Sequence, residues 1–67
     1  MVWLFNGSGV GPYTLSSTIG NRKIDVFLDG LLKEEGGDWT RDSVNNQISF
    51  TFSVPSVTRI RTRVYNS

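Results

Sequence analysis

The sequence contains no cysteine and no histidine, and it has only two prolines and one methionine in 67 residues. Without cysteine the chain has no disulfide, and without either residue type it lacks the side chains that bind most structural zinc. The acidic residues do not follow the spacing of an EF-hand calcium loop. We therefore expect no cofactor and no metal. A core of this length supplies only about 3–5 kcal/mol, so self-association is the expected reinforcement.

The same absences bear on catalysis. The usual nucleophilic triads cannot be built without histidine or cysteine. Glycoside hydrolysis needs two carboxyl groups about 5–9.5 Å apart across a cleft. Glu34 and Glu35 are adjacent and point to opposite sides of an extended chain, while Asp25 and Asp29 share an outward strand face. These observations argue against an enzyme.

Long apolar runs are missing as well. The longest, residues 2–5, is much shorter than a membrane span or the apolar region of a signal peptide. We expect a soluble chain, made in the cytoplasm without a cleaved leader and without a membrane partner.

Charge is nearly balanced at +1 but is unevenly distributed. All six acidic residues lie between positions 25 and 42, whereas Arg59, Arg61 and Arg63 lie within the last nine positions. An acidic middle and a basic end favour packing between neighbouring copies over binding to a polyanion.

The clearest local pattern is a β-hairpin that begins at Ile24. Ile24, Val26 and Leu28 alternate with Asp25, Phe27 and Asp29, as in a half-buried strand. Asp29 and Gly30 then form a two-residue turn of type I′, in which both residues need positive φ. We expect Leu28 to lie opposite Leu31 across this turn.

The remaining pattern is also that of strands and turns. Residues 2–5 predict an edge strand or an arm, and residues 6–12 a flexible glycine-rich turn; a phosphate-binding loop is the weaker alternative, because no helix follows. Asn45 and Asn46 predict a second hairpin turn. The strands around these turns predict one common interior, with Tyr13 and Trp39 in the core or at its rim. Its expected members are Ile24, Val26, Leu28, Ile48, Phe50, Phe52, Ile60 and Val64.

Together these segments predict an all-β fold, a small antiparallel sandwich or open barrel of six to seven short strands. Residues 1–67 form a single β-domain, with an N-terminal arm and glycine-rich turn in residues 1–12 and the β-core in residues 13–65. In the last strand, residues 58–65, Arg59, Arg61, Arg63 and Tyr65 share one face. The three guanidinium groups form a row about 13 Å long.

The order of these segments resembles a small β-domain of bacteriophage virion structural proteins, of the tail-fibre and appendage type. The likeness covers residues 3–65. The matching positions are Trp3, Phe5, Gly9 and the Tyr13-Thr14-Leu15 step; Val26-Phe27-Leu28-Asp29-Gly30; Gly36-Gly37-Asp38-Trp39-Thr40; and Ile48-Ser49-Phe50-Thr51-Phe52, Pro55 and residues 60–65.

The resemblance implies a non-enzymatic structural subunit of the virion, located in a tail or fibre, the neck or a head appendage. Its expected partners are further copies of itself, with a trimer as the expected state, and other virion proteins. The expected contact residues are Trp3, Phe5, Arg59, Arg61, Arg63 and Tyr65.

Three other interpretations stay open. The arginine row could be a solvated strand face. The chain could be a module that binds host glycans or a host receptor through Trp39, Tyr13 and nearby acids. It could also be a small-barrel nucleic-acid binder led by the arginine row, which is the least favoured because only Tyr65 offers a stacking ring on that face.

Overall fold

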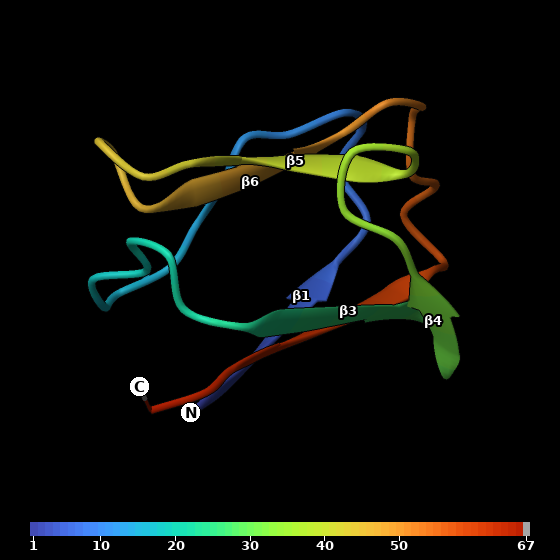
Figure 1. Ribbon diagram of the computed structural model, residues 1–67. Coiled ribbons are helices and arrows are strands. Elements are labelled where there is room, and N and C mark those ends of the chain that lie inside the picture. The colour runs from blue at the N-terminus through green and yellow to red at the C-terminus, as the bar shows by residue number, and fades with distance from the viewer. Residues whose placement is uncertain (67) are drawn as a thin grey trace.

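The computed structural model describes residues 1–66, and it confirms the all-β fold. Within this range the chain forms seven strands in two antiparallel sheets that face each other as a small sandwich (Figure 1). No helix in these residues is long and apolar enough to cross a membrane. The strands are β1 (Val2–Asn6), β2 (Tyr13–Thr14), β3 (Ile24–Leu28), β4 (Leu31–Lys33), β5 (Trp39–Asp42), β6 (Gln47–Phe50) and β7 (Arg59–Val64).

The strand order brings the two ends of the chain together. One sheet has the order β1-β7-β3-β4 and the other the order β2-β6-β5. The first and last strands are therefore neighbours, and the two termini lie side by side in Figure 1. The edges of the larger sheet are β1 and β4.

The central hairpin has the predicted turn and register. Leu28 lies opposite Leu31, and both Asp29 (φ 49°) and Gly30 (φ 86°) have the positive φ of a type I′ turn. Asp29 also joins the hairpin to β7. Its N–H donates to the carbonyl oxygen of Arg59 (2.9 Å), and its carboxylate accepts the N–H of Arg59 (2.9 Å).

The second predicted turn is also present, in residues 43–46 between β5 and β6. Asn46 has positive φ (55°), whereas Asn45 does not. The side-chain oxygen of Asn46 accepts the N–H of Ile19 (3.1 Å), and its carbonyl oxygen accepts the N–H of Leu15 (2.8 Å). The turn therefore also holds the connection between β2 and β3 in place.

Seven of the eight predicted core residues are buried, and the prediction for Phe52 is wrong. β6 ends at Phe50, where the N–H of Thr51 donates to Asp38 and the chain bends. Phe52 is 38% exposed, and its ring lies tilted against that of Phe50, with the ring centres 5.7 Å apart. The buried apolar residues are Tyr13, Leu15, Ile19, Ile24, Val26, Leu28, Trp39, Ile48, Phe50, Val54, Ile60 and Val64.

Of the two alternatives for the N-terminal segment, the structure confirms the edge strand and not the arm, and the glycine-rich segment is held by hydrogen bonds. Residues 2–6 form the edge strand β1, paired with β7 along its length. Gly9 and Val54 exchange backbone hydrogen bonds (3.0 and 3.1 Å). The Tyr13 hydroxyl accepts the N–H of Ser8 and donates to the carbonyl of Gly9. The turn is therefore held by β2 and by the connection between β6 and β7.

Candidate interaction surface

The outer face of the four-stranded sheet carries the arginine row. Along β7, Arg59, Arg61 and Arg63 are exposed, whereas Ile60, Thr62 and Val64 are buried. This alternation is the predicted one. It arises because successive side chains of a strand point to opposite faces of the sheet.

The arginines alternate with apolar side chains across the sheet. Arg61 lies between Leu4 of β1 and Phe27 of β3, and Leu32 of β4 lies beyond Phe27 in the same row. Leu4 is 74% exposed and Leu32 is 60% exposed. The face therefore offers apolar area and positive charge together.

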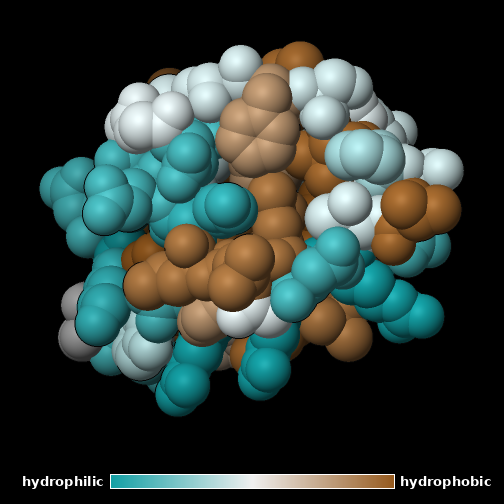
Figure 2. Space-filling view, turned by 90° about the vertical axis from the view of Figure 1, so that its right-hand side faces the viewer, coloured by the Kyte–Doolittle hydropathy of each residue, from teal (hydrophilic) through white to brown (hydrophobic). Residues whose placement is uncertain are grey.

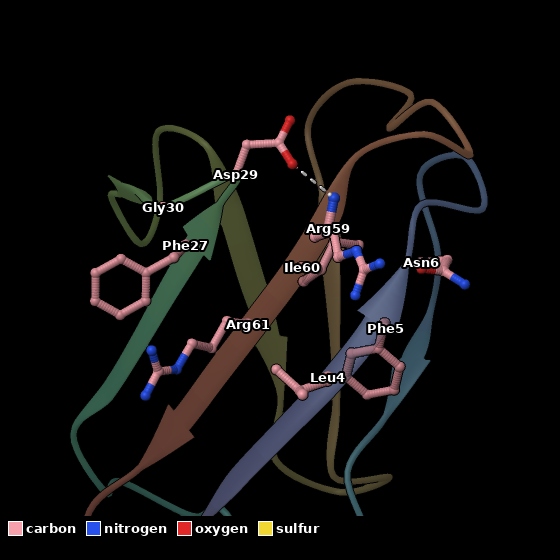
Figure 3. A pocket seen from close by; sticks show the side chains of 9 residues that line it. All are labelled: Leu4, Phe5, Asn6, Phe27, Asp29, Gly30, Arg59, Ile60 and Arg61. Carbon is pink, nitrogen blue, oxygen red and sulfur yellow. Dashed lines mark hydrogen bonds between the residues drawn. The ribbon is translucent and has the colours of Figure 1, made fainter.

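One end of this face is hollowed into an open groove of about 570 Å³. Figure 3 shows Arg61 between Phe27 and Leu4, with Arg59 and Asp29 toward the end at which β3 turns. Within residues 1–66 neither arginine forms an ion pair with a side chain. The residues that line the groove are Leu4, Phe5, Asn6, Phe27, Asp29, Gly30, Arg59, Ile60 and Arg61.

Arg63 differs from the other two arginines because it is engaged by its own neighbours. Its guanidinium lies 4.7 Å from the centre of the Tyr65 ring, and the ammonium of Lys23 lies 4.9 Å from the same ring. The Tyr65 hydroxyl donates to the Asp25 carboxylate (2.7 Å), and this hydrogen bond raises the pKa of Tyr65. Arg63 and Tyr65 therefore form a local cluster outside the groove.

Trp3 and Phe5 lie on the opposite face of β1 from the arginine row. Both are partly buried and pack against the core. The Trp3 indole donates to the Ser16 hydroxyl (2.9 Å), and the Phe5 ring meets Tyr13 edge to face at 5.5 Å. The monomer thus covers part of Trp3, which was expected to be a contact residue for a partner.

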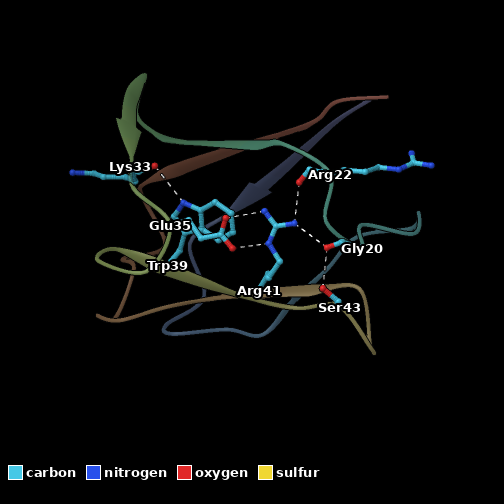
Figure 4. Close-up of polar contacts among 7 residues, drawn as sticks. All are labelled: Gly20, Arg22, Lys33, Glu35, Trp39, Arg41 and Ser43. Carbon is cyan, nitrogen blue, oxygen red and sulfur yellow. Dashed lines mark hydrogen bonds and ion pairs between the residues drawn. The ribbon is translucent and has the colours of Figure 1, made fainter. Parts of the chain in front are cut away.

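Another cation, Arg41 on β5, has a structural role that the sequence did not reveal. Its guanidinium donates to both carboxylate oxygens of Glu35 (2.6 and 2.7 Å) and to the carbonyls of Gly20 and Arg22 (2.9 Å each), as Figure 4 shows. The hydrogen bond from Arg41 lowers the pKa of Glu35. Arg41 therefore joins three segments of the fold and is not available to a partner.

A second apolar area lies on the side of the molecule where β4 meets the connection between β6 and β7. Figure 2 shows apolar side chains across the middle of this side, with polar groups around them. β4 supplies the exposed Leu31 and Leu32, and the connection supplies Phe52 and Val57. Since Leu32 also belongs to the outer face, the two apolar areas meet along β4.

With this geometry in place, the chain was compared with protein-family models, curated proteins and solved structures, and none of them matches it.

Proposed function

We propose that this chain is a non-enzymatic structural subunit of a bacteriophage virion, which self-associates and attaches to another virion protein through the outer face of the four-stranded sheet. The observation that carries a binding role is the groove in which Arg59 and Arg61 lie beside Leu4 and Phe27, with no ion pair to any side chain of residues 1–66. The assignment to a virion rests on the resemblance of residues 3–65 to appendage domains. The part of the particle can be a tail or fibre, the neck or a head appendage.

The chemistry of the groove defines the partner. Arginine and aromatic residues are enriched in protein interfaces, and an exposed apolar patch marks a contact surface when it is contiguous. An acidic segment with an apolar side chain would pair the two guanidinium groups and cover Leu4. The fitting partner is therefore an acidic, partly apolar protein surface.

The test uses two double variants with equal change in net charge. The groove variant carries Arg59→Glu and Arg61→Glu, and the control carries Arg22→Glu and Lys33→Glu. Each reversal changes the charge by two, so both take the chain from +1 to −3. Both should keep the circular dichroism spectrum of the native chain, because all four side chains lie outside the core.

Only the groove variant should fail to enter particles, since each disrupted charge pair at an interface costs about 2–5 kcal/mol. Mass spectrometry of purified particles measures incorporation. Equal incorporation of the two variants would refute attachment through this face. The row would then be a solvated strand surface.

A second candidate function, binding to single-stranded nucleic acid, is supported by one specific observation. Phe27 lies beside Arg61 on the face that also carries Tyr65, so two rings rather than one accompany the arginines. Proteins that bind single strands usually combine aromatic rings, on which bases stack, with positively charged side chains. Asp25 and Asp29 on the same face oppose this function. Binding to a labelled oligonucleotide at increasing salt would test it.

The glycan alternative loses its expected contact residues. Trp39 is 1% exposed and Tyr13 is 5% exposed, so neither ring can stack on a sugar.

A further inference from the structure

We infer that β1 pairs edge to edge with β1 of a second copy, which joins two four-stranded sheets into one continuous antiparallel sheet. This inference deepens the self-association in the proposed function, on which it rests for its place in a particle. The evidence is the direction of the backbone groups of β1, the composition of the edge and its self-complementary order.

Alternate backbone groups of β1 point away from β7. Met1 and Val64 exchange hydrogen bonds (2.9 Å each), and the N–H of Gly7 donates to the carbonyl of Thr58 (2.9 Å). In an antiparallel ladder such bonded pairs alternate with pairs that are not bonded. Trp3 and Phe5 therefore bond to β7, and the N–H and C=O groups of the other three residues point outward. These residues are Val2, Leu4 and Asn6.

In the ladder described by residues 1–66, these outward groups face away from the only strand that pairs with β1. Outside the strand ladders, none of the backbone hydrogen bonds within residues 1–66 involves these three residues, and the alternation of the ladder directs their groups away from β7. Their side chains are all exposed, Leu4 by 74%. β1 is thus an open edge five residues long.

β1 also lacks the features by which proteins protect sheet edges. Edges are normally short, or carry charges, proline or a bulge. The other three edge strands comply: β2 has two residues, β4 has three and ends in Lys33, and β5 carries Arg41 and Asp42. β1 has the sequence VWLFN, with no charge and no proline. Its composition favours pairing with another strand.

The order of residues in β1 fits a second copy of itself. In a twofold antiparallel pair centred on Leu4, the two Leu4 residues face each other and Val2 faces Asn6 of the second copy. Each of these pairs exchanges both backbone hydrogen bonds. Trp3 then faces Phe5 at a position without hydrogen bonds, where side chains approach most closely. Cross-strand aromatic pairs of this kind stabilise sheets, and both rings would lose their remaining exposure.

Charge does not oppose this pairing. The nearest arginine rows would be those of β7 and of β7 in the second copy, separated by two β1 strands. Three strand spacings place them about 14 Å apart. Since the Debye length at physiological salt is about 8 Å, repulsion between the rows is largely screened. On the outer face the two Leu4 side chains would meet at the dimer axis, and the rest of each groove, around Arg59 and Arg61, stays open to another protein.

The decisive experiment places proline at equivalent positions on the two edges of the sheet. Leu4→Pro removes an outward N–H without removing a bond to β7. Leu32→Pro is the matched control: a two-residue hairpin closes with the bonded pair Leu28 and Leu31, so the N–H of Leu32 also points outward, on the β4 edge. Sedimentation equilibrium should show a dimer for the native chain and for Leu32→Pro. Leu4→Pro should raise the dimer dissociation constant more than about tenfold.

If either proline variant fails to fold, hydrogen exchange on the unmodified chain tests the same pairing. Amide exchange at Val2, Leu4 and Asn6 should slow as the protein concentration rises, whereas Trp3 and Phe5 should stay protected at all concentrations. In a mixture of labelled and unlabelled chains, the Hα protons of Trp3 and Phe5 should show an interchain contact.

Three results would overturn the inference: a monomer at all concentrations, a trimer, or a dimer that Leu4→Pro leaves intact. A trimer counts against it because twofold strand pairing closes with two copies. The outcome is separable from that of the proposed function. A monomer that enters particles refutes the edge pairing alone, whereas a β1-paired dimer that enters particles despite Arg59→Glu and Arg61→Glu refutes the attachment face alone.

Discussion

Gly7 is the position at which a single methyl group should be most damaging. A Cβ built on Gly7 would lie 1.8 Å from the carbonyl oxygen of Pro55 and 2.8 Å from that of Val54. Gly7 does not have positive φ, so the constraint is the close approach of two backbone segments and not an unusual conformation. Gly7→Ala must therefore move residues 54–55 away from the end of β1.

The expected cost follows from the bonds at this crossing. The N–H of Gly7 donates to Thr58, and Gly9 and Val54 exchange two further bonds. A backbone hydrogen bond contributes about 1 kcal/mol net, so their disruption should cost about 2–3 kcal/mol. This is most of the roughly 3–5 kcal/mol available to a domain of this size. Since 1 kcal/mol corresponds to about 4–8 °C here, Tm should fall by about 10–20 °C.

Thermal unfolding followed by circular dichroism measures this change, at one low protein concentration so that self-association does not alter Tm. Gly37→Ala is the matched control, because no atom lies within 4 Å of its added Cβ and its φ is not positive. The control should melt within a few degrees of the native chain. If Gly7→Ala and the control have the same Tm, the packing of residues 7–9 against residues 54–58 does not contribute to stability as proposed.

Three further predictions concern the core and one ion pair. Phe50→Ala should lower the free energy of unfolding by about 3–5 kcal/mol in urea titrations, and Phe52→Ala by less than half of that, because Phe52 is partly exposed; equal losses would contradict this. Thr62→Val should raise Tm, since it replaces a buried hydroxyl that has no hydrogen-bond partner within residues 1–66; a lower Tm would show that the hydroxyl is satisfied. The hydrogen bond from Arg41 lowers the pKa of Glu35, so its stabilisation is present above the ordinary value of 4.5 and is lost as the pH falls through the lowered pKa. Glu35→Gln should flatten the curve of stability against pH below about pH 4.5. An unchanged curve would show that the ion pair between Arg41 and Glu35 does not stabilise the fold.

Local signals explain which parts of the fold were predictable. Alternation predicted the face of β7, and the Asp29-Gly30 step predicted the hairpin with its register, because both depend on residues close in sequence. Phe52 shows the limit of this reasoning. The alternating pattern continues to position 52, but the partner strand β5 begins only at Trp39, and residues 36–38 before it form a turn, so the paired strand ends at Phe50.

The candidate surface was predictable only in part, because it depends on pairing between distant segments. The arginine row is visible in the sequence, since it lies within one strand. The places of Leu4 and Phe27 beside Arg61 follow from the pairing of β7 with both β1 and β3, which no local pattern specifies. Arg41 is a similar case: nothing in its sequence neighbourhood distinguishes it from the exposed arginines, and its role appears only when Glu35 and the carbonyl of Gly20 are seen around it.

Edge pairing and attachment would reinforce each other. In the proposed dimer, the row of Leu32, Phe27, Arg61 and Leu4 continues into the same row of the second copy in reverse order, so two grooves lie on one continuous sheet. A partner that presents two acidic segments would bind the second groove as an intramolecular step, at an effective concentration set by the spacing of the grooves. Each groove can then bind weakly while the dimer attaches firmly. The open edge of β1 would promote aggregation of an isolated monomer. In the proposed dimer the same edge pairs two copies and so increases the affinity with which the arginine face binds its partner.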